Sequence, residues 1–280
     1  MTQWQRPVVG FEYRAQTLSV SKDWQQEKLA ACGIDAAVFR QDVDPAFFIG
    51  LAIDAGIQSG ISAQGNVNMV QRLTLHRRVV LGEELRVHGR IVAVDAVPRG
   101  ERISSEVWFE DSAGKPVISA NRTSLRPDPN RVGVRGAGER AAPVFDEHTL
   151  REALAEYALT PQCVRDYSME GNSIHYDEAA AVAAGFPAPL IGGGMGVHYL
   201  TAQIWRHGRP EKLDMELYFR RPIFWNESLS VVCAGKASDP SGWLALGLMK
   251  AHKIATEARI NQLIYATPGE DAGHSSIRQQ

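Results

Sequence analysis

The residues whose types and spacing could do chemistry lie in one stretch, residues 167–196. Within it, Glu170 and His175 are five positions apart, and Gly171, Asn172 and Ser173 stand among the residues between them. These small and polar residues allow the backbone to fold back on itself. A carboxylate and an imidazole that meet at one small molecule can share the general acid and general base work of adding or removing water. The sequence therefore predicts Glu170 and His175 as a catalytic pair.

A glycine run at residues 192–194 opens the apolar segment "IGGGMGVHYL". The first N–H groups of a helix have no partner within that helix, and glycines let a carbonyl oxygen approach them closely. We therefore expect Gly193 and Gly194 to form an oxyanion site for a thioester. A dinucleotide-binding fingerprint is disfavoured, because its third glycine would fall on Val197 and no strand-helix-strand pattern precedes it.

The sequence next to these residues predicts the elements that position them. Asp177 precedes an alanine-rich segment that Gly185 closes, which predicts an N-cap, a short helix and a glycine just beyond its end. His175 is thereby placed on the loop before that helix. For His175 alone, a solvent-exposed loop histidine is the alternative interpretation.

The chain also contains an internal repeat. "LTLHRRVVLGEELRV", from Leu73, and "LYFRRPIFWNESLSV", from Leu217, align without a gap at an offset of 144. The same offset places Gly50 on Gly194. Two distant segments that agree on one register indicate two copies of a unit of about 130 residues.

Each copy shows an apolar helix followed by strands with alternating polar and apolar residues. The fold class is therefore predicted to be α+β, with each long buried helix wrapped by an antiparallel sheet. The expected domains are an N-terminal unit at 1–127, a linker at 128–147, a C-terminal unit at 148–267 and a flexible tail at 268–280. The expected helices cover 45–60 and 193–205, and the expected strands cover 67–79, 83–97, 102–111, 115–126, 212–223, 228–237, 243–253 and 258–266.

The stretch "YSMEGNSIHYDEAAAVAAGFPAPLIGGGM" resembles the hydratase motif of the MaoC-like, or R-specific enoyl-CoA hydratase, family. This resemblance implies a hotdog fold, and the internal repeat is similar to the fused double-hotdog members. It also implies that His175 and Glu170 take the places of the family's histidine and aspartate. Asn172 takes the place of the asparagine, and Gly194 that of the glycine that binds the thioester oxygen.

The resemblance implies a lyase that interconverts 2-enoyl and 3-hydroxyacyl thioesters, carried by CoA more readily than by acyl carrier protein, without any further cofactor. The sequence departs from the family pattern in having glutamate for aspartate at Glu170, serine for proline at Ser173 and glycine for histidine at Gly193. A non-catalytic acyl-thioester-binding subunit and a hotdog acyl-CoA thioesterase are therefore kept as alternatives. At the offset of 144, the pair would fall on Gln26 and Ala31, so the first copy is expected to lack it and to form the other wall of an acyl tunnel.

Two further residues are candidates for the pocket. His198 lies three positions after Met195 and could face the acyl group, although a core or interface histidine is the alternative. Arg221 could contact CoA phosphates or a substrate carboxylate, but its repeat partner Arg77 equally favours a structural role.

The composition excludes several other classes of protein. The formal net charge is −2 and the cationic residues are scattered, which disfavours nucleic acid and membrane partners. The three cysteines are far apart and lack metal-ligand spacing, so we expect a reducing compartment, buried thiols and no metal site. No segment has the length of a signal peptide core or a membrane span, and a cytoplasmic protein in fatty acid metabolism is expected. The partner is expected to be a small acyl thioester, and two double-hotdog chains could pair as a homodimer.

Overall fold

The computed structural model describes residues 4–131, 134, 136–146, 148–168 and 172–266. Glu170 and the predicted tail at 268–280 lie outside these residues. The helices are α1 (Lys22–Ala31), α2 (Phe47–Gln58), α3 (Pro161–Ser168), α4 (Glu178–Ala183) and α5 (Gly193–His207), with short 3-10 helices at Ala36–Phe39, Pro129–Arg131, Ser173–His175 and Pro240–Gly242. The strands are β1 (Gln16–Leu18), β2 (Val67–Leu75), β3 (Leu85–Val97), β4 (Gly100–Glu110), β5 (Pro116–Pro127), β6 (Arg151–Ala158), β7 (Pro210–Phe219), β8 (Ser228–Ala234), β9 (Ala245–Lys250) and β10 (Lys253–Tyr265).

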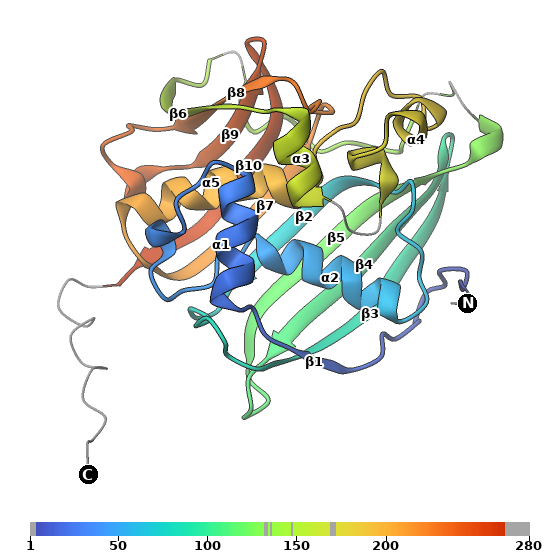
Figure 1. Ribbon diagram of the computed structural model, residues 1–280, viewed down its shortest axis with the longest axis horizontal. Coiled ribbons are helices and arrows are strands. Elements are labelled where there is room, and N and C mark those ends of the chain that lie inside the picture. The colour runs from blue at the N-terminus through green and yellow to red at the C-terminus, as the bar shows by residue number, and fades with distance from the viewer. Residues whose placement is uncertain (1–3, 132–133, 135, 147, 169–171, 267–280) are drawn as a thin grey trace.

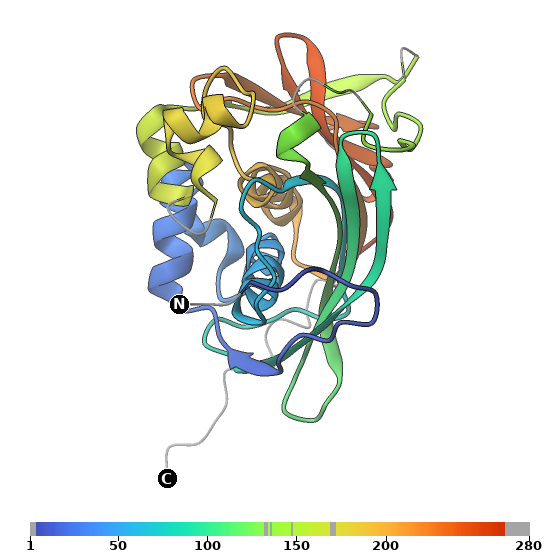
Figure 2. The same ribbon diagram turned by 90° about the vertical axis from the view of Figure 1, so that its right-hand side faces the viewer.

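The strands form one antiparallel sheet in the order β1-β3-β4-β5-β2-β7-β10-β9-β8-β6. The sheet curves around α2 and α5, which Figure 2 shows end-on and side by side on its concave face. Figure 1 shows α1 and α3 crossing over these two helices as an outer layer. Each long helix is thus wrapped by the strands of its own half. The chain has the double-hotdog fold that was predicted.

The two halves meet where β2 pairs with β7. Arg72 lies opposite Glu216 in that pairing, and 216 − 72 = 144, which is the offset of the sequence repeat. A residue that pairs with its own repeat partner lies on a two-fold axis. The central strands are therefore related by an internal two-fold, and the two half-sheets continue into each other.

The long helices are buried because their sequences are apolar on almost every side. In α5, each residue from Met195 to Trp205 is buried. In α2, Phe47, Phe48 and Ile49 are among the buried residues, and Phe48 packs edge-on against Phe109 of β4. The core therefore lies between the two helices and the concave face of the sheet.

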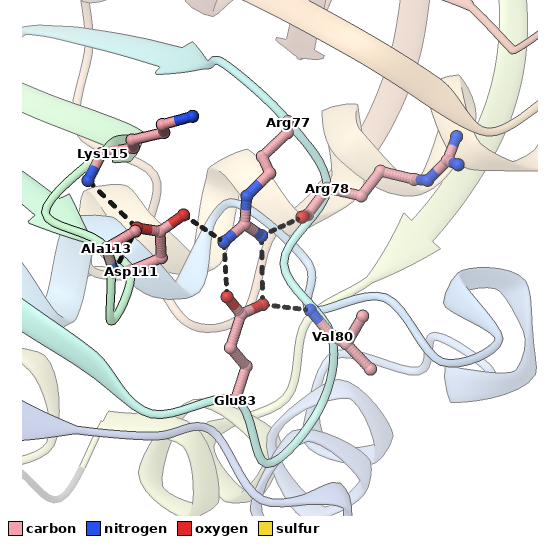
Figure 3. Close-up of polar contacts among 7 residues, drawn as sticks. All are labelled: Arg77, Arg78, Val80, Glu83, Asp111, Ala113 and Lys115. Carbon is pink, nitrogen blue, oxygen red and sulfur yellow. Dashed lines mark hydrogen bonds and ion pairs between the residues drawn. The ribbon is translucent and has the colours of Figure 1, made fainter. Parts of the chain in front are cut away.

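The repeated motif builds the same turn in both halves. Glu83 accepts a hydrogen bond from the N–H of Val80, and its repeat partner Glu227 accepts one from Phe224. Figure 3 shows the first copy, in which the carboxylate of Glu83 also faces Arg77. Because these turns begin soon after the strands, β2 ends at 75 rather than 79 and β7 ends at 219 rather than 223.

The offset of 144 does not extend to the elements before the long helices. By element order α1 corresponds to α3, and these helices begin 161 − 22 = 139 positions apart. The 3-10 helix that carries His175 likewise corresponds to the one at Ala36–Phe39 rather than to Ala31. The second half contains α4 between these elements and its long helix, which accounts for the shift in register. The expected equivalence of His175 with Ala31 is therefore wrong, although no histidine stands at 36–39 either, and the equivalence of Glu170 with Gln26 falls on a residue outside the described ranges.

Part of the predicted linker packs on the C-terminal half. The carboxylate of Glu257 on β10 accepts hydrogen bonds from the N–H groups of Val144 and Phe145. Arg220 pairs with the same carboxylate and donates to the carbonyls of Ala141 and Ala142. These contacts hold the segment beside the end of β7.

The three cysteines are free thiols, and Cys32 and Cys233 are buried as predicted, whereas Cys163 is partly exposed. In the part of the chain that the structure describes, no helix is long and apolar enough to cross a membrane. The same residues contain no group of three or more histidine, cysteine, aspartate or glutamate side chains placed to hold a metal ion.

Candidate active site

A cavity of about 610 Å³ lies between the two halves. The first half contributes an apolar wall from α2 and the start of β2, and the second half contributes residues around the predicted motif. Such a cavity is large enough for an acyl chain and is mostly apolar, as small-molecule sites are. The apolar wall includes Phe47, Ile49, Leu51, Ile53, Ile57 and Val67.

His175 lines this cavity in a defined tautomer. Its Nδ1 lies 2.7 Å from the carbonyl oxygen of Leu190. Because a carbonyl only accepts hydrogen bonds, Nδ1 carries the proton and Nε2 of the neutral ring is a base. Burial lowers the pKa of His175, an effect that the hydrogen bond to Leu190 partly opposes. The ring is therefore neutral at neutral pH, with its basic nitrogen available to the cavity.

The loop that carries His175 is held by hydrogen bonds to residues of the first half. Asn172 accepts a hydrogen bond from the N–H of Gly65 and donates one to the carbonyl of Asn66. The hydroxyl of Ser173 accepts a hydrogen bond from Gln64 at 2.7 Å. Asn172 lines the cavity, but its amide is used to position the loop. On the other side of His175, the side chain of Asp177 accepts from Ala180 and caps α4, as predicted.

The glycine run begins α5 and faces the same cavity. The N-cap Gly192 makes no side-chain capping bond, and a Cβ added to it would lie 3.7 Å from Nε2 of His175. A Cβ on Gly194 would lie 3.3 Å from the hydroxyl of Tyr167. The N–H groups at the start of the helix thus lie where a base and a hydroxyl converge. A thioester oxygen bound there would be stabilised by these N–H groups and by the helix dipole.

Gly193 is required by the close approach of two side chains. A Cβ at this position would lie 2.9 Å from Nδ2 of Asn68 and 2.9 Å from the ring of Phe219. We expect Gly193→Ala to displace these groups and to lower kcat/KM for the cavity's substrate by about 10–100-fold, because small displacements of reacting groups are costly. Thermal unfolding measures how far the displacement affects stability, and steady-state kinetics measure kcat/KM.

Gly50→Ala is the matched control for this prediction. Gly50 also lines the cavity and lies within α2, but a Cβ there would have no atom within 4 Å. Alanine should therefore leave kcat/KM within about threefold and raise stability by up to about 1 kcal/mol, since it favours helix. Equal activity of the two variants would show that the glycine run is not at the reacting group.

The lowered pKa of His175 predicts a pH dependence with a defined sign. The unfolded side chain takes up a proton below the ordinary histidine value of 6.5, whereas the buried ring resists protonation. The free energy of unfolding should therefore fall as the pH drops below 6.5, and His175 should contribute no pH dependence above it. Turnover that uses Nε2 as a base should persist below pH 6.5 and fall only through the lower folded-state pKa. A pH-rate profile and an NMR titration of the imidazole check both statements.

His198 lies one layer behind the cavity. Its side chain is fully buried, its Nδ1 is 2.7 Å from a carboxylate oxygen of Asp44 and its Nε2 is 2.9 Å from the hydroxyl of Tyr167. His198 therefore does not line the cavity itself, but it hydrogen-bonds to Tyr167, which does. The sequence did not indicate this chain of contacts, because Asp44 belongs to the other half.

Arg221 and its repeat partner Arg77 have different surroundings. Arg77 donates to Glu83 and to Asp111, as Figure 3 shows. In the second half, Glu227 pairs with Lys250 instead, and Arg221 donates to the backbone carbonyl of Ile254. Arg221 is exposed and lines the cavity. It is therefore placed to meet an anionic group that enters there.

The structure brings most of the predicted site residues to one cavity, namely Asn172, His175, Gly193, Gly194 and Arg221. Glu170 lies outside the described residues, so its place relative to His175 stays a prediction. Tyr167, Asn68 and Arg122 also line the cavity and were not predicted. Tyr167 begins the motif stretch, whereas the other two come from strands of the first half.

Comparison with solved structures supports this fold. HtdX from Mycobacterium tuberculosis superimposes with a TM-score of 0.71 at 18% identity, covering 88% of this chain and 97% of HtdX. A MaoC-like dehydratase from Phytophthora capsici gives 0.65 at 15% identity and covers 91% and 95% of the two chains. An acyl-ACP thioesterase from Bacteroides thetaiotaomicron gives 0.55 at 10% identity, with 88% and 96% covered. No protein-family profile and no curated protein sequence matches the chain. The resemblance to MaoC-like dehydratases is thus confirmed for the fold.

Proposed function

We propose that this protein adds water to 2-enoyl thioesters, or removes it from 3-hydroxyacyl thioesters, with CoA as the favoured carrier. The observation that carries the proposal is the meeting of His175 Nε2 with the glycine N-terminus of α5 in one largely apolar cavity. A base beside an oxyanion site is the arrangement that conjugate addition of water to a thioester needs. The similarity in fold to a MaoC-like dehydratase supports the same chemistry.

In the proposed reaction, each of these cavity residues has a separate role. The thioester oxygen accepts hydrogen bonds from the N–H groups of Gly193 and Gly194, which stabilise the enolate that forms. His175 Nε2 takes a proton from water as the water oxygen bonds to C3, and C2 receives a proton. Glu170 is proposed as the partner that orients the water and returns a proton. Dehydration follows the same steps in reverse.

The charged residues at the cavity favour a CoA ester over other carriers. Arg99, Arg140 and Arg221 line the cavity together with Arg220, whose guanidinium is held by Glu257. Arg99 and Arg140 also line a neighbouring cavity of about 680 Å³. Guanidinium groups are suited to phosphates, and CoA carries several of them.

Hydrolysis of an acyl thioester is the second candidate, because the fold is also similar to that of an acyl-ACP thioesterase. The two reactions have different products. Hydration consumes the conjugated double bond and leaves the thioester intact, whereas hydrolysis releases a free thiol.

The test is to incubate the purified protein with 2-enoyl-CoA esters of several chain lengths and to record the enoyl thioester absorbance and the free thiol together. Loss of absorbance without thiol supports hydration, and thiol release supports the second candidate. If neither signal changes for any ester, the proposed function is wrong.

A further inference from the structure

The cavity has an excess of cationic side chains. Among the described residues that line it, Asp54 supplies the one carboxylate, and it is exposed on α2. A cavity with this balance of charge attracts an anionic ligand. The cationic lining residues are Lys28, Arg99, Arg122, Arg140, Arg220 and Arg221.

Arg122 differs from the other cationic residues in its place in the fold. It lies on β5 in the middle of the sheet, opposite Gln71 of β2 and Ser105 of β4, and both of these neighbours are buried. Burial lowers the pKa of its guanidinium, yet arginine remains charged in proteins. Arg122 itself is half-buried, so its charge is partly withdrawn from solvent and lies beside the cavity.

The guanidinium of Arg122 also has few hydrogen-bond partners and no counter-charge among the described residues. Among the described residues, its hydrogen-bond partner is the neutral amide of Asn68, at 3.5 Å, and no carboxylate pairs with it. By contrast, Arg220 pairs with the carboxylate of Glu257 at 2.6 Å. A charge that is partly withdrawn from solvent and has no counter-charge is costly, so an anionic ligand that pairs with it would be bound favourably.

From this arrangement, we propose that Arg122 binds a carboxylate on the acyl chain, so that the substrate is the monothioester of a dicarboxylic acid. The inference rests on the proposed function, because it assumes an acyl thioester in the cavity. The planar guanidinium can hold a carboxylate through two parallel hydrogen bonds. A methyl-terminated chain would leave the guanidinium without a partner, and the site would discriminate against it.

The position of Arg122 also indicates a short acyl chain. Oδ1 of Asn68 is 3.5 Å from the guanidinium, and Nδ2 of the same amide lies 2.9 Å from the place of a Cβ on Gly193. One amide side chain therefore separates Arg122 from the glycine run where the thioester oxygen is expected. The carboxylate should lie a few bonds from the thioester, as it does in chains of about four to six carbons, which extend little more than 1 Å per bond along the chain.

Calorimetry with saturated thioesters tests this inference without depending on turnover. Glutaryl-CoA and pentanoyl-CoA have acyl chains of equal length that end in a carboxylate and a methyl group. We expect the wild-type protein to bind glutaryl-CoA more tightly than pentanoyl-CoA. Arg122→Gln should weaken the binding of glutaryl-CoA by on the order of 30-fold or more, as for loss of a desolvated charge pair. The affinity for pentanoyl-CoA should change by less than about twofold in the same variant. Equal weakening of both esters, or no change in either, would overturn the inference.

Two further variants serve as controls. Arg126 lies on the same strand and lines the neighbouring cavity, so Arg126→Gln should leave the ratio of the two affinities unchanged. Arg122→Lys keeps the charge without the planar fork and should retain part of the preference. Thermal unfolding should show Arg122→Gln to be at least as stable as wild type, because it removes a half-buried charge that no carboxylate of the described residues pairs with. A large loss of stability would instead assign Arg122 a structural role and contradict the inference.

Kinetics with the matching enoyl esters separate this inference from the proposed function. If neither glutaconyl-CoA nor 2-pentenoyl-CoA is hydrated but glutaryl-CoA binding depends on Arg122, the proposed function fails and the carboxylate site stands. If both enoyl esters are hydrated equally well and Arg122→Gln changes neither, hydration stands and the carboxylate site fails.

Discussion

Replacing His175 by asparagine is expected to lower turnover of the enoyl thioester by about 10²–10⁴-fold, the range for loss of a general base. Asparagine can still donate a hydrogen bond to the carbonyl of Leu190, but it has no basic nitrogen to replace Nε2. The loss should therefore appear in kcat with little change in folding. Steady-state kinetics and thermal unfolding of the purified variant measure the two quantities.

His207→Asn is the matched control. His207 makes the same kind of contact, from Nδ1 to the carbonyl of Gln203 at 2.8 Å, but it does not line the cavity. This variant should keep wild-type turnover. If His175→Asn were as active as His207→Asn, the base would have to be another residue.

Replacing His198 by leucine is expected to lower the free energy of unfolding by about 3 kcal/mol, because a buried polar group left without its hydrogen-bond partner costs about 1–3 kcal/mol and a charged group costs more. Asp44 and His198 are both fully buried, and leucine leaves the carboxylate of Asp44 and the hydroxyl of Tyr167 without this partner. The Asp44 carboxylate would keep its hydrogen bond from the N–H of Ala46. Equilibrium denaturation measures the loss.

A surface pair provides the control for this loss. Arg90 lies 2.7 Å from the carboxylate of Glu106, and these side chains are 54% and 40% exposed. Arg90→Leu should cost less than about 1 kcal/mol, because solvent screens exposed pairs. Similar losses in the two variants would show that burial adds little to the stabilisation by the contact between Asp44 and His198.

The sequence was sufficient for the fold because its main signals are local or repeated. Alternation of polar and apolar residues located eight strands but missed β1 and β6, and the offset of 144 indicated two copies of one unit. That the copies pair at Arg72 and Glu216 is seen only in the structure. The ends of β2 and β7 were placed too late, since the turns that end them depend on the carboxylates of Glu83 and Glu227. The outer helices α1 and α3 carry no comparable signal and were not predicted.

The candidate site was predictable to the extent that it lies within one stretch of chain. His175, Gly193 and Gly194 are close in sequence, so their types and spacing were enough to predict that they share one cavity. Arg122 and Asn68 come from strands of the first half, and only the folded chain brings them to the cavity. The contact of Asp44 with His198 spans the two halves in the same way. No local pattern could have revealed these residues.

The most direct test of the central claim is to follow the oxygen atom of water. The protein would be incubated with a 2-enoyl-CoA ester in water labelled with heavy oxygen, and the acyl products analysed by mass spectrometry. Addition of water at His175 predicts one heavy oxygen on C3 of an intact 3-hydroxyacyl thioester, with no label in a carboxylate. Label found in a free acid together with released CoA, or in no product at all, would contradict it.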